Sequence, residues 1–308
     1  MRKITQFTAV AVVALGALLH AAPAEAQAPR TFVSGQGSDS NPCSTVQTPC
    51  RHFAAALAQT APGGEITVLD SAGYGEFTIA QSVTITAIGV EAGITSTSGA
   101  SAITIHATSA ATVTLRGLTL EGGGVGANGI NLTSTAGGTL NIIDCVVKDF
   151  TESGIAIQPA VSGTSQTEYV VIANTFALNN TQNGINLATQ TTASAVSASI
   201  YQTTATSNGT GIALSSNEGF ISASISSSHA DMNNNLGINQ TSEGDLVIKS
   251  STVQQNAIND IINTDGFLFM CNNNTIGGLN TSVVAYTDGT NNIEALSGAG
   301  SLTKLAPR

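Results

Sequence analysis

The amino-acid sequence predicts an all-β fold, a right-handed parallel β-helix solenoid of about eight coils with a short N-terminal capping helix. Three observations lead to this prediction. A Gly-Ile-x-apolar motif recurs about every 27 residues, an alternating apolar strand follows each copy, and Asn and Gly separate successive coils. Period-two alternation is typical of a strand with one buried face, and Asn and Gly accept the left-handed backbone of sharp corners. Stacked coils share a continuous core that no single coil can bury alone.

The repeat itself is regular enough to exclude other solenoids. Its first residues lie at steps of 25, 30, 27 and 26 residues, at Gly129, Gly154, Gly184, Gly211 and Gly237. Related segments at 102–105 and 76–79 extend the series upstream. Helical repeats need amphipathic helices, whereas the Thr, Val and Ile of these segments favour strands. The Leu-x-x-Leu-x-Leu signature of leucine-rich repeats is absent.

Residues 1–26 have the pattern of a secretory signal peptide. Arg2 and Lys3 form a short positive region, an apolar run covers 7–19, and small residues at 22–26 form a cleavage site. The alternative is a membrane anchor, but the run is shorter than the ~20 apolar residues that span a bilayer. No later segment is apolar enough to do so. The sequence therefore predicts export to the periplasm or the extracellular space.

The remaining chain divides into three parts. Residues 27–63 are expected to form an N-terminal cap, with a helix over 51–61 and a Cys43–Cys50 disulfide, which an oxidising compartment favours. Residues 64–290 form the parallel β-helix, and 291–308 form a C-terminal tail. Cys145 and Cys271 lie in apolar strand patterns four to five coils apart, so both are expected to be unpaired core thiols.

Charge excludes several classes of partner. Only 9% of the residues are charged, and the formal net charge is −10. An acidic surface with so few Lys and Arg is a poor fit for nucleic acid, which is bound largely through its phosphates. It suits anionic polysaccharides or lipids no better. No metal-binding or cofactor motif is present, and the sequence does not indicate an oligomeric state.

One column of small and amide side chains is expected to stack along the solenoid. Its members lie about one repeat apart, at Cys145, Asn174, Gln202, Ser227, Ser250 and Asn272. Side chains in such a column hydrogen-bond from coil to coil, as amide ladders do in other stacked β structures. The column is therefore interpreted as structural.

Three segments resemble the right-handed parallel β-helix proteins of the pectate-lyase-like superfamily. They are residues 64–69, 75–79 and 113–120, and the resemblance covers roughly 30–290. It implies the fold more strongly than an activity, because the superfamily includes lyases, hydrolases, esterases, epimerases and binding proteins. The lyase, polygalacturonase and pectin-esterase signatures are all incomplete here. Few basic residues follow Arg116, which argues against a groove for polyuronates.

The outward positions of the Gly-Ile strands are the first candidate site. If Ile130 and Leu132 point inward, Asn131 points outward, and the same applies to Asn186 and Asn239. Amides suit the hydroxyls of a neutral glycan. A solvated face with no ligand is the alternative, and the absence of Trp and the presence of only four Tyr favour it.

An acidic cluster is the second candidate. Asp144, Asp149 and Glu152 lie within one coil. They could form part of a metal site or a glycosidase pair, because two carboxylates suffice for glycoside hydrolysis. The alternative is a solvated acidic turn.

Two classes of function remain open. The first is an exported β-helix scaffold or binding module, recognising a neutral glycan or another surface component, with no identifiable catalytic centre. The alternative is a carbohydrate-active enzyme of the polysaccharide lyase or glycoside hydrolase type, acting at the β-helix groove. The incomplete catalytic signatures favour the first class.

The signal-peptide interpretation yields a direct prediction. Signal peptidase should cut after Ala26, because the small-x-small pattern ends there. Mass spectrometry of the exported protein should therefore find a mature N-terminus near Gln27. Recovery of a chain that begins at Met1, or retention in the cytoplasm, would contradict the prediction.

Overall fold

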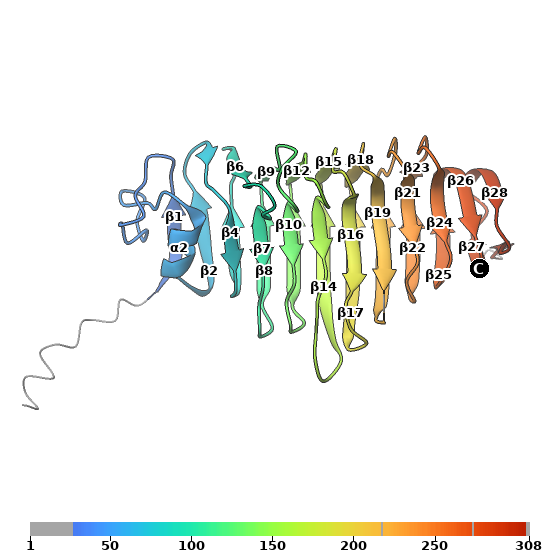
Figure 1. Cartoon of the computed structure of the whole chain (residues 1–308), viewed down its shortest axis with the longest axis horizontal. Helices are drawn as coiled ribbons and strands as arrows, with labels where there is room; N and C mark the ends of the chain where they lie inside the picture. Colours follow the sequence, from blue (N-terminus) through green and yellow to red (C-terminus); the bar gives the residue numbers. More distant parts are fainter. Residues whose placement is uncertain (1–26, 217, 273, 306–308) are drawn as a thin grey trace, which may run out of the picture.

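The computed structural model is an elongated parallel β-solenoid, with the N-terminal cap at one end and the last strands at the other (Figure 1). It describes residues 27–216, 218–272 and 274–305. The predicted signal peptide, residues 1–26, lies outside the described residues. The predicted all-β solenoid of about eight coils with one N-terminal helix is confirmed.

Three parallel sheets form the solenoid. Two of them extend over most of its length, and the third covers only its N-terminal and central coils. The long sheet consists of β1 (Ala28–Val33), β2 (Thr60–Val68), β5 (Val83–Thr86), β8 (Thr112–Arg116), β11 (Thr139–Ile143), β14 (Gln166–Ala173), β17 (Ser194–Tyr201), β20 (Phe220–Ser226), β22 (Asp245–Lys249), β25 (Phe267–Cys271), β27 (Val284–Thr287) and β29 (Ser301–Lys304). The Gly-Ile sheet consists of β4 (Phe77–Ile79), β7 (Ile103–Ile105), β10 (Ile130–Leu132), β13 (Ile155–Ile157), β16 (Asn183–Thr189), β19 (Thr210–Ser216), β21 (Leu236–Gln240), β24 (Asn259–Asn263), β26 (Thr275–Thr281), β23 (Thr252–Val253) and β28 (Asn292–Ser297). The short sheet consists of β3 (Ala72–Gly73), β6 (Ala92–Thr95), β9 (Leu118–Glu121), β12 (Val146–Lys148), β15 (Phe176–Leu178) and β18 (Thr204–Thr206).

The core is built by stacking like residues on like. In the Gly-Ile sheet, Ile103 pairs with Ile130, and Ile130 with Ile155. In the long sheet, Ile172 pairs with Ile200, which continues the same kind of column. These side chains are fully buried. Apolar burial stabilises folding by about 25 cal/mol per Å², and neighbouring coils supply the surface that each coil lacks.

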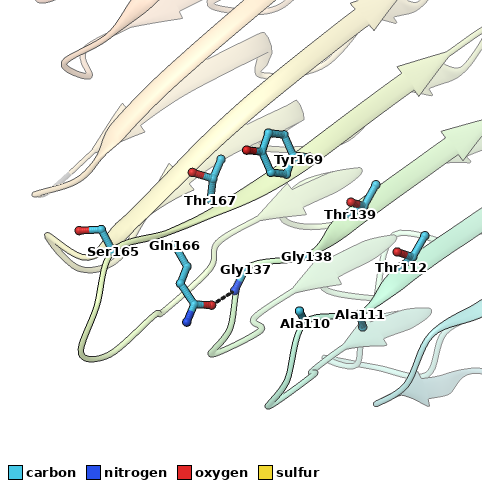
Figure 2. Close-up of a pocket in the computed structure, with 10 residues that line it drawn as sticks. All are labelled: Ala110, Ala111, Thr112, Gly137, Gly138, Thr139, Ser165, Gln166, Thr167 and Tyr169. Carbon is cyan, nitrogen blue, oxygen red and sulfur yellow. Dashed lines mark hydrogen bonds between the residues drawn. The ribbon is translucent and has the colours of Figure 1, made fainter.

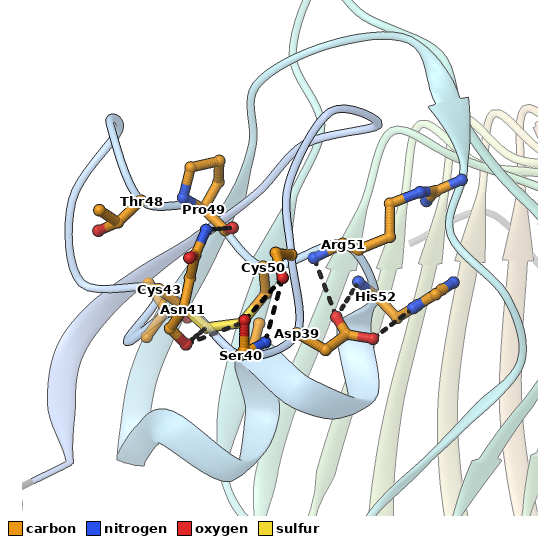
Figure 3. Close-up of a disulfide and its surroundings, with 12 residues drawn as sticks. Asp39, Ser40, Asn41, Cys43, Thr48, Pro49, Cys50, Arg51 and His52 are labelled. Carbon is orange, nitrogen blue, oxygen red and sulfur yellow. Dashed lines mark hydrogen bonds and ion pairs between the residues drawn. A yellow bond between two sulfur atoms is a disulfide. The ribbon is translucent and has the colours of Figure 1, made fainter.

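The N-terminal cap holds the first coil. Helix α2 (Phe53–Gln59) is shorter than the predicted 51–61 segment and buries Phe53 and Ala56. The predicted Cys43–Cys50 disulfide is present in the loop before it (Figure 3). Asp39 accepts hydrogen bonds from the backbone N–H groups of Arg51 and His52, at 3.0 and 2.9 Å, and so fixes the entry to the helix.

Strands are also found where the sequence analysis placed only cap and tail. β1 pairs in parallel with β2, so residues of the N-terminal cap belong to the long sheet. At the other end, β28 pairs with β26 and β29 pairs with β27, within the segment 291–308 that was expected to be a tail. Both C-terminal strands therefore extend the sheets of the solenoid.

An asparagine ladder runs through one buried corner, between the short sheet and the Gly-Ile sheet. The Nδ2 groups of Asn180, Asn208 and Asn233 donate to Oδ1 of the next asparagine at 2.9, 3.2 and 2.9 Å, and Asn256 is the last amide. Asn256 in turn donates to the Asp260 carboxylate at 2.7 Å. The same amides also satisfy buried backbone groups, which would otherwise cost about 1–3 kcal/mol each. From the sequence, Asn180, Asn208 and Asn233 were expected only as corner residues between coils.

The glycines of the repeat are required by this ladder. A Cβ at Gly184 would lie 2.7 Å from Nδ2 of Asn208 and from the carbonyl oxygen of Gly211. A Cβ at Gly211 would lie 2.8 Å from Nδ2 of Asn233. Contacts this short do not occur for real Cβ atoms, so any larger residue would push the ladder and the next coil apart. The glycine of each Gly-Ile motif therefore leaves the space that an amide of the ladder occupies.

The predicted column at the other corner is shifted by one residue at its start. Cys145 stacks with Thr175, whose Oγ1 accepts its N–H at 3.4 Å. Asn174 instead stacks on Asp144, to which it donates at 2.8 Å. Asp144 and Asn174 both have positive φ, so the first residue of each corner is exposed and the second is buried. Sequence spacing alone does not distinguish two adjacent corner residues.

The two unpaired cysteines differ in environment. Both are free, as predicted. Cys145 is buried in the core. Cys271 is half-buried and pairs with Lys249 on the outward face of the long sheet, so its assignment to the core is wrong.

Replacing one ladder residue tests how much the ladder contributes. Asn208→Ala removes the acceptor of both the Asn180 N–H and its Nδ2, and the donor to Ala177 O. We expect it to lower the free energy of unfolding by at least about 2 kcal/mol. Asn234 is an exposed turn residue and gives the control, because Asn234→Ala should change the free energy of unfolding by less than about 0.5 kcal/mol. Chemical denaturation followed by circular dichroism measures both, and equal midpoints would argue against the ladder.

Candidate functional site

The C-terminal groove is a hollow of about 650 Å³ on the outward side of the long sheet. It crosses four successive strands, β20, β22, β25 and β27, near their N-terminal ends. We define it by its lining residues, Phe220, Glu243, Gly244, Asp245, Asp265, Gly266, Phe267, Val283, Val284 and Tyr286. It therefore combines aromatic rings with carboxylates in one open site.

Strand register brings the aromatic and acidic groups together. Asp245 pairs directly with Phe267, and Phe269 pairs with Tyr286. The rings of Phe269 and Tyr286 are stacked, with centroids 5.1 Å apart and planes at 14°. Phe267 is 54% exposed and Phe220 47%. Large rings left in solvent in this way mark binding surfaces more often than isolated exposed side chains do.

The charge of the groove is unbalanced. Glu243, Asp245 and Asp265 line it, and no basic residue does. None of these three carboxylates takes part in the ion pairs found among the described residues. Asp265 accepts a hydrogen bond from the N–H of Gly266 at 2.8 Å, which shapes the turn before β25.

A second hollow, the central hollow, lies further toward the N-terminus on the same sheet. It measures about 430 Å³ and is lined by loop ends and strand starts of β8, β11 and β14. Figure 2 shows Thr112, Thr139 and Tyr169 along its wall, with Gln166 accepting a hydrogen bond from the N–H of Gly137 at 2.7 Å. Its lining contains hydroxyls, one amide and one aromatic ring but no charged group.

The two hollows lie along one outward ladder of the long sheet. Thr112 pairs with Thr139, and Thr139 with Tyr169. Tyr169 pairs with Ser197, and Ser197 with Ser222 at the edge of the C-terminal groove. Adjacent strands are ~4.8 Å apart. The ladder therefore forms a continuous polar track that ends at the aromatic rings.

A buried carboxylate lies behind the wall of the central hollow. Glu168 in β14 is 3% exposed, and its Oε2 has no hydrogen-bond partner among the described residues. It borders a small internal cavity that shares Ala111, Gly138 and Thr139 with the central hollow. Burial raises the pKa of Glu168 to about 7, and the Gly138 backbone opposes this only in part. Because its side chain points inward, Glu168 does not line the central hollow.

The predicted asparagine stripe is in register, but it is not an open groove. Asn131 pairs with Ala156, Ala156 with Asn186, and Asn186 with Ala213, which pairs with Asn239. The three asparagines are half-buried, and the intervening alanines are buried. Ligand binding at this stripe remains a prediction.

The predicted acidic cluster is spread over separate corners of its coil. Asp144 accepts from Arg116 at 3.0 Å. Asp149 accepts from Asn179 at 2.6 Å. Glu152 accepts from Asn128 at 2.7 Å, so each carboxylate has a different partner on a neighbouring coil.

In residues 27–305, excluding the two undescribed positions, no group of three His, Cys, Asp or Glu side chains is placed to hold a metal ion. Within the same described segments, no helix is long and apolar enough to cross a membrane.

Sequence reasoning missed the C-terminal groove because its parts are 66 residues apart along the chain, from Phe220 to Tyr286. The signal that could have found it is the Phe267-Leu268-Phe269 pattern. Two rings at alternate positions of a strand must share its outward face when Leu268 is buried. Aligning that strand with Asp245 one coil earlier would have placed a carboxylate beside the rings.

Comparison with known proteins identifies the architecture. No family model matches the chain, and no curated protein matches it. A pectate lyase structure, Pel9A, is 15% identical, covers 91% of this chain and 78% of its own, and superposes with a TM-score of 0.57. The chain has a pectate-lyase-like parallel β-helix fold. A GH136 lacto-N-biosidase from Eubacterium ramulus shares this β-helix, with 10% identity, coverage of 90% and 68%, and a TM-score of 0.54. At these identities the likeness concerns the fold alone.

The buried Glu168 predicts a pH-dependent stability. Its folded-state pKa is raised, so the folded protein keeps a proton that the unfolded chain releases between its ordinary pKa of 4.5 and about 7. Stability should therefore fall as pH rises through that window and stay low above it. Glu168→Gln should leave the melting temperature unchanged at about pH 4 and raise it at about pH 8, by the equivalent of at most about 3 kcal/mol.

The control is Glu294→Gln, because Glu294 is exposed on β28. The difference in melting temperature between Glu294→Gln and the wild type should be the same at both pH values. A Glu168→Gln variant whose difference is likewise independent of pH would refute the assignment. Thermal unfolding followed by circular dichroism gives all of these values.

Proposed function

We propose that this protein binds carbohydrate chains in the C-terminal groove and that it acts outside the cytoplasm. The observation that carries the proposal is a set of aromatic rings, the exposed Phe220 and Phe267 and the half-buried Tyr286, beside three carboxylates. Aromatic faces pack against the C–H faces of sugar rings, and carboxylates accept hydrogen bonds from sugar hydroxyls.

The shape of the surface supports a chain rather than a single small molecule. The groove is open and continues into the polar track formed by Ser222, Ser197 and Tyr169. An extended polymer lying along the solenoid axis would meet one coil every ~4.8 Å. The pectate lyase and the lacto-N-biosidase with this fold act, by their names, on carbohydrates, which is consistent with the proposal.

Location outside the cytoplasm is supported by two independent features. Residues 1–26 have the pattern of a signal peptide. The Cys43–Cys50 disulfide is of a kind that persists in oxidising compartments.

A second candidate function is glycoside hydrolysis at the same groove. Glu243 and Asp265 precede adjacent strands of the long sheet, so their backbones are expected to lie about one coil step apart, ~4.8 Å. Paired carboxylates roughly 5–9.5 Å apart are what glycosidases use. Binding is preferred, because none of these carboxylates has a partner that would mark it as the acid or the base.

Aromatic substitution tests the proposed binding. Phe267→Ala should weaken binding of soluble glycan oligomers about tenfold, since loss of one stacked ring costs about 1.4 kcal/mol. Tyr201→Ala is the matched control, because Tyr201 is exposed on β17 of the same sheet but does not line the groove. Isothermal titration calorimetry against a panel of oligosaccharides measures the affinities.

Two outcomes would contradict the proposal. One is no binding to any oligomer of the panel, and the other is an equal loss of affinity in both variants. Release of reducing sugar that Glu243→Gln or Asp265→Asn abolishes would select the hydrolase in place of the binding module.

A further inference from the structure

The C-terminal groove concentrates negative charge without any basic residue to balance it. Its lining holds Glu243, Asp245 and Asp265, and its other members are Gly, Val, Phe and Tyr. Lys249 is four residues along β22 from Asp245, which places it roughly 13 Å away along the strand. That distance exceeds the Debye length of about 8 Å at physiological ionic strength. Lys249 therefore offsets little of the negative charge in the groove.

We infer that the ligand of the groove is an amino-sugar oligomer with free ammonium groups, of the polyglucosamine type. This inference rests on the proposed carbohydrate-binding function and names its substrate class. A unit charge 4 Å from a carboxylate gains about 1 kcal/mol in water and more near a protein surface. The carboxylate of an acidic sugar would be repelled by a similar electrostatic energy. A neutral sugar would gain only hydrogen bonds.

The aromatic rings favour the same ligand. Ammonium groups are attracted to the faces of Phe and Tyr, by about 0.5–1 kcal/mol at exposed sites. The exposed ring of Phe267 lies in register with Asp245, so a sugar ring packed on Phe267 has its ammonium group within reach of a carboxylate. A neutral or acetylated sugar would use the ring and could give the carboxylate hydrogen bonds, but it would form no ion pair with it.

The repeat of the solenoid suits a polymer of such sugars. Glu243 and Asp265 come from adjacent coils, and the groove spans four strands, or roughly 14 Å at ~4.8 Å per step. One step is close to the length of one sugar unit in an extended chain. Rigid rings also lose less conformational entropy on binding than flexible lysine side chains do. These two points favour an amino sugar over a basic peptide.

The test compares four tetramers on the full mature protein by isothermal titration calorimetry. They are tetraglucosamine, its N-acetylated form, tetragalacturonate and tetralysine, at about pH 5.5, where amines are protonated and ordinary carboxylates are ionised. We expect tetraglucosamine to bind at least about tenfold more tightly than the N-acetylated tetramer at low ionic strength. High salt should reduce that preference, and tetragalacturonate should not bind.

Charge-neutral variants locate the preference. Glu243→Gln and Asp265→Asn should each reduce the preference for tetraglucosamine severalfold while binding of the N-acetylated tetramer is retained. Glu294→Gln, a neutralisation of an exposed carboxylate on β28, should leave the preference unchanged. A preference that survives in Glu243→Gln and Asp265→Asn would overturn the inference.

The remaining outcomes separate the two proposals. Equal binding of the free and N-acetylated tetramers would overturn the amino-sugar inference and leave the carbohydrate function standing. Tetralysine binding as tightly as tetraglucosamine would make the groove a basic-peptide site and would also overturn it. If no tetramer binds, while circular dichroism shows a folded protein, the carbohydrate function fails as well.

Discussion

The fit between each ladder asparagine and the glycine of the preceding coil determines how closely the coils can stack. Nδ2 of Asn208 occupies the space where a Cβ on Gly184 would lie, and the carbonyl oxygen of Gly211 approaches from the next coil. The amide satisfies backbone groups that the corner turns away from both sheets. Because buried polar groups are costly when unpaired, the corner, the motif and the inter-coil distance are set together. The sheets, and the groove built across them, depend on that spacing.

Much of the fold could be predicted because its signals are local and repeated. The Gly-Ile spacing gave the coils, and the Cys43–Cys50 pair is close enough in sequence to be assigned. What failed were distinctions between neighbouring residues. Cys145 was aligned with Asn174, although it stacks with Thr175. The two adjacent residues of each corner are small or polar, so the sequence does not show which of them has positive φ and which is buried. Cys271 was placed inside because its strand is apolar on both faces, so alternation gives no direction.

The candidate site was harder to predict because it follows from register between coils. The aromatic count looked too low for a sugar site when the rings were considered one by one. Stacking collects Phe220, Phe267 and Tyr286 onto one hollow, so a small number of rings forms a local patch. The asparagine stripe shows the opposite effect, since its residues are aligned as expected yet are half-buried between alanines. Alignment along the solenoid therefore does not by itself create an accessible surface.

The asparagine ladder has a direction, and that direction limits how the molecule can change in length. In the bonds between side chains, every amide donates toward the C-terminus, and the Asp260 carboxylate accepts the last bond. Duplicating an internal coil, such as the one that carries Asn208, would conserve each donor–acceptor pair. Duplicating the coil that carries Asp260 would put an anion inside the row, at a point where the side chain would have to donate to the next coil and an ionised carboxylate has no proton to donate. Growth of this solenoid by whole coils is therefore compatible with the ladder only upstream of its acidic terminus.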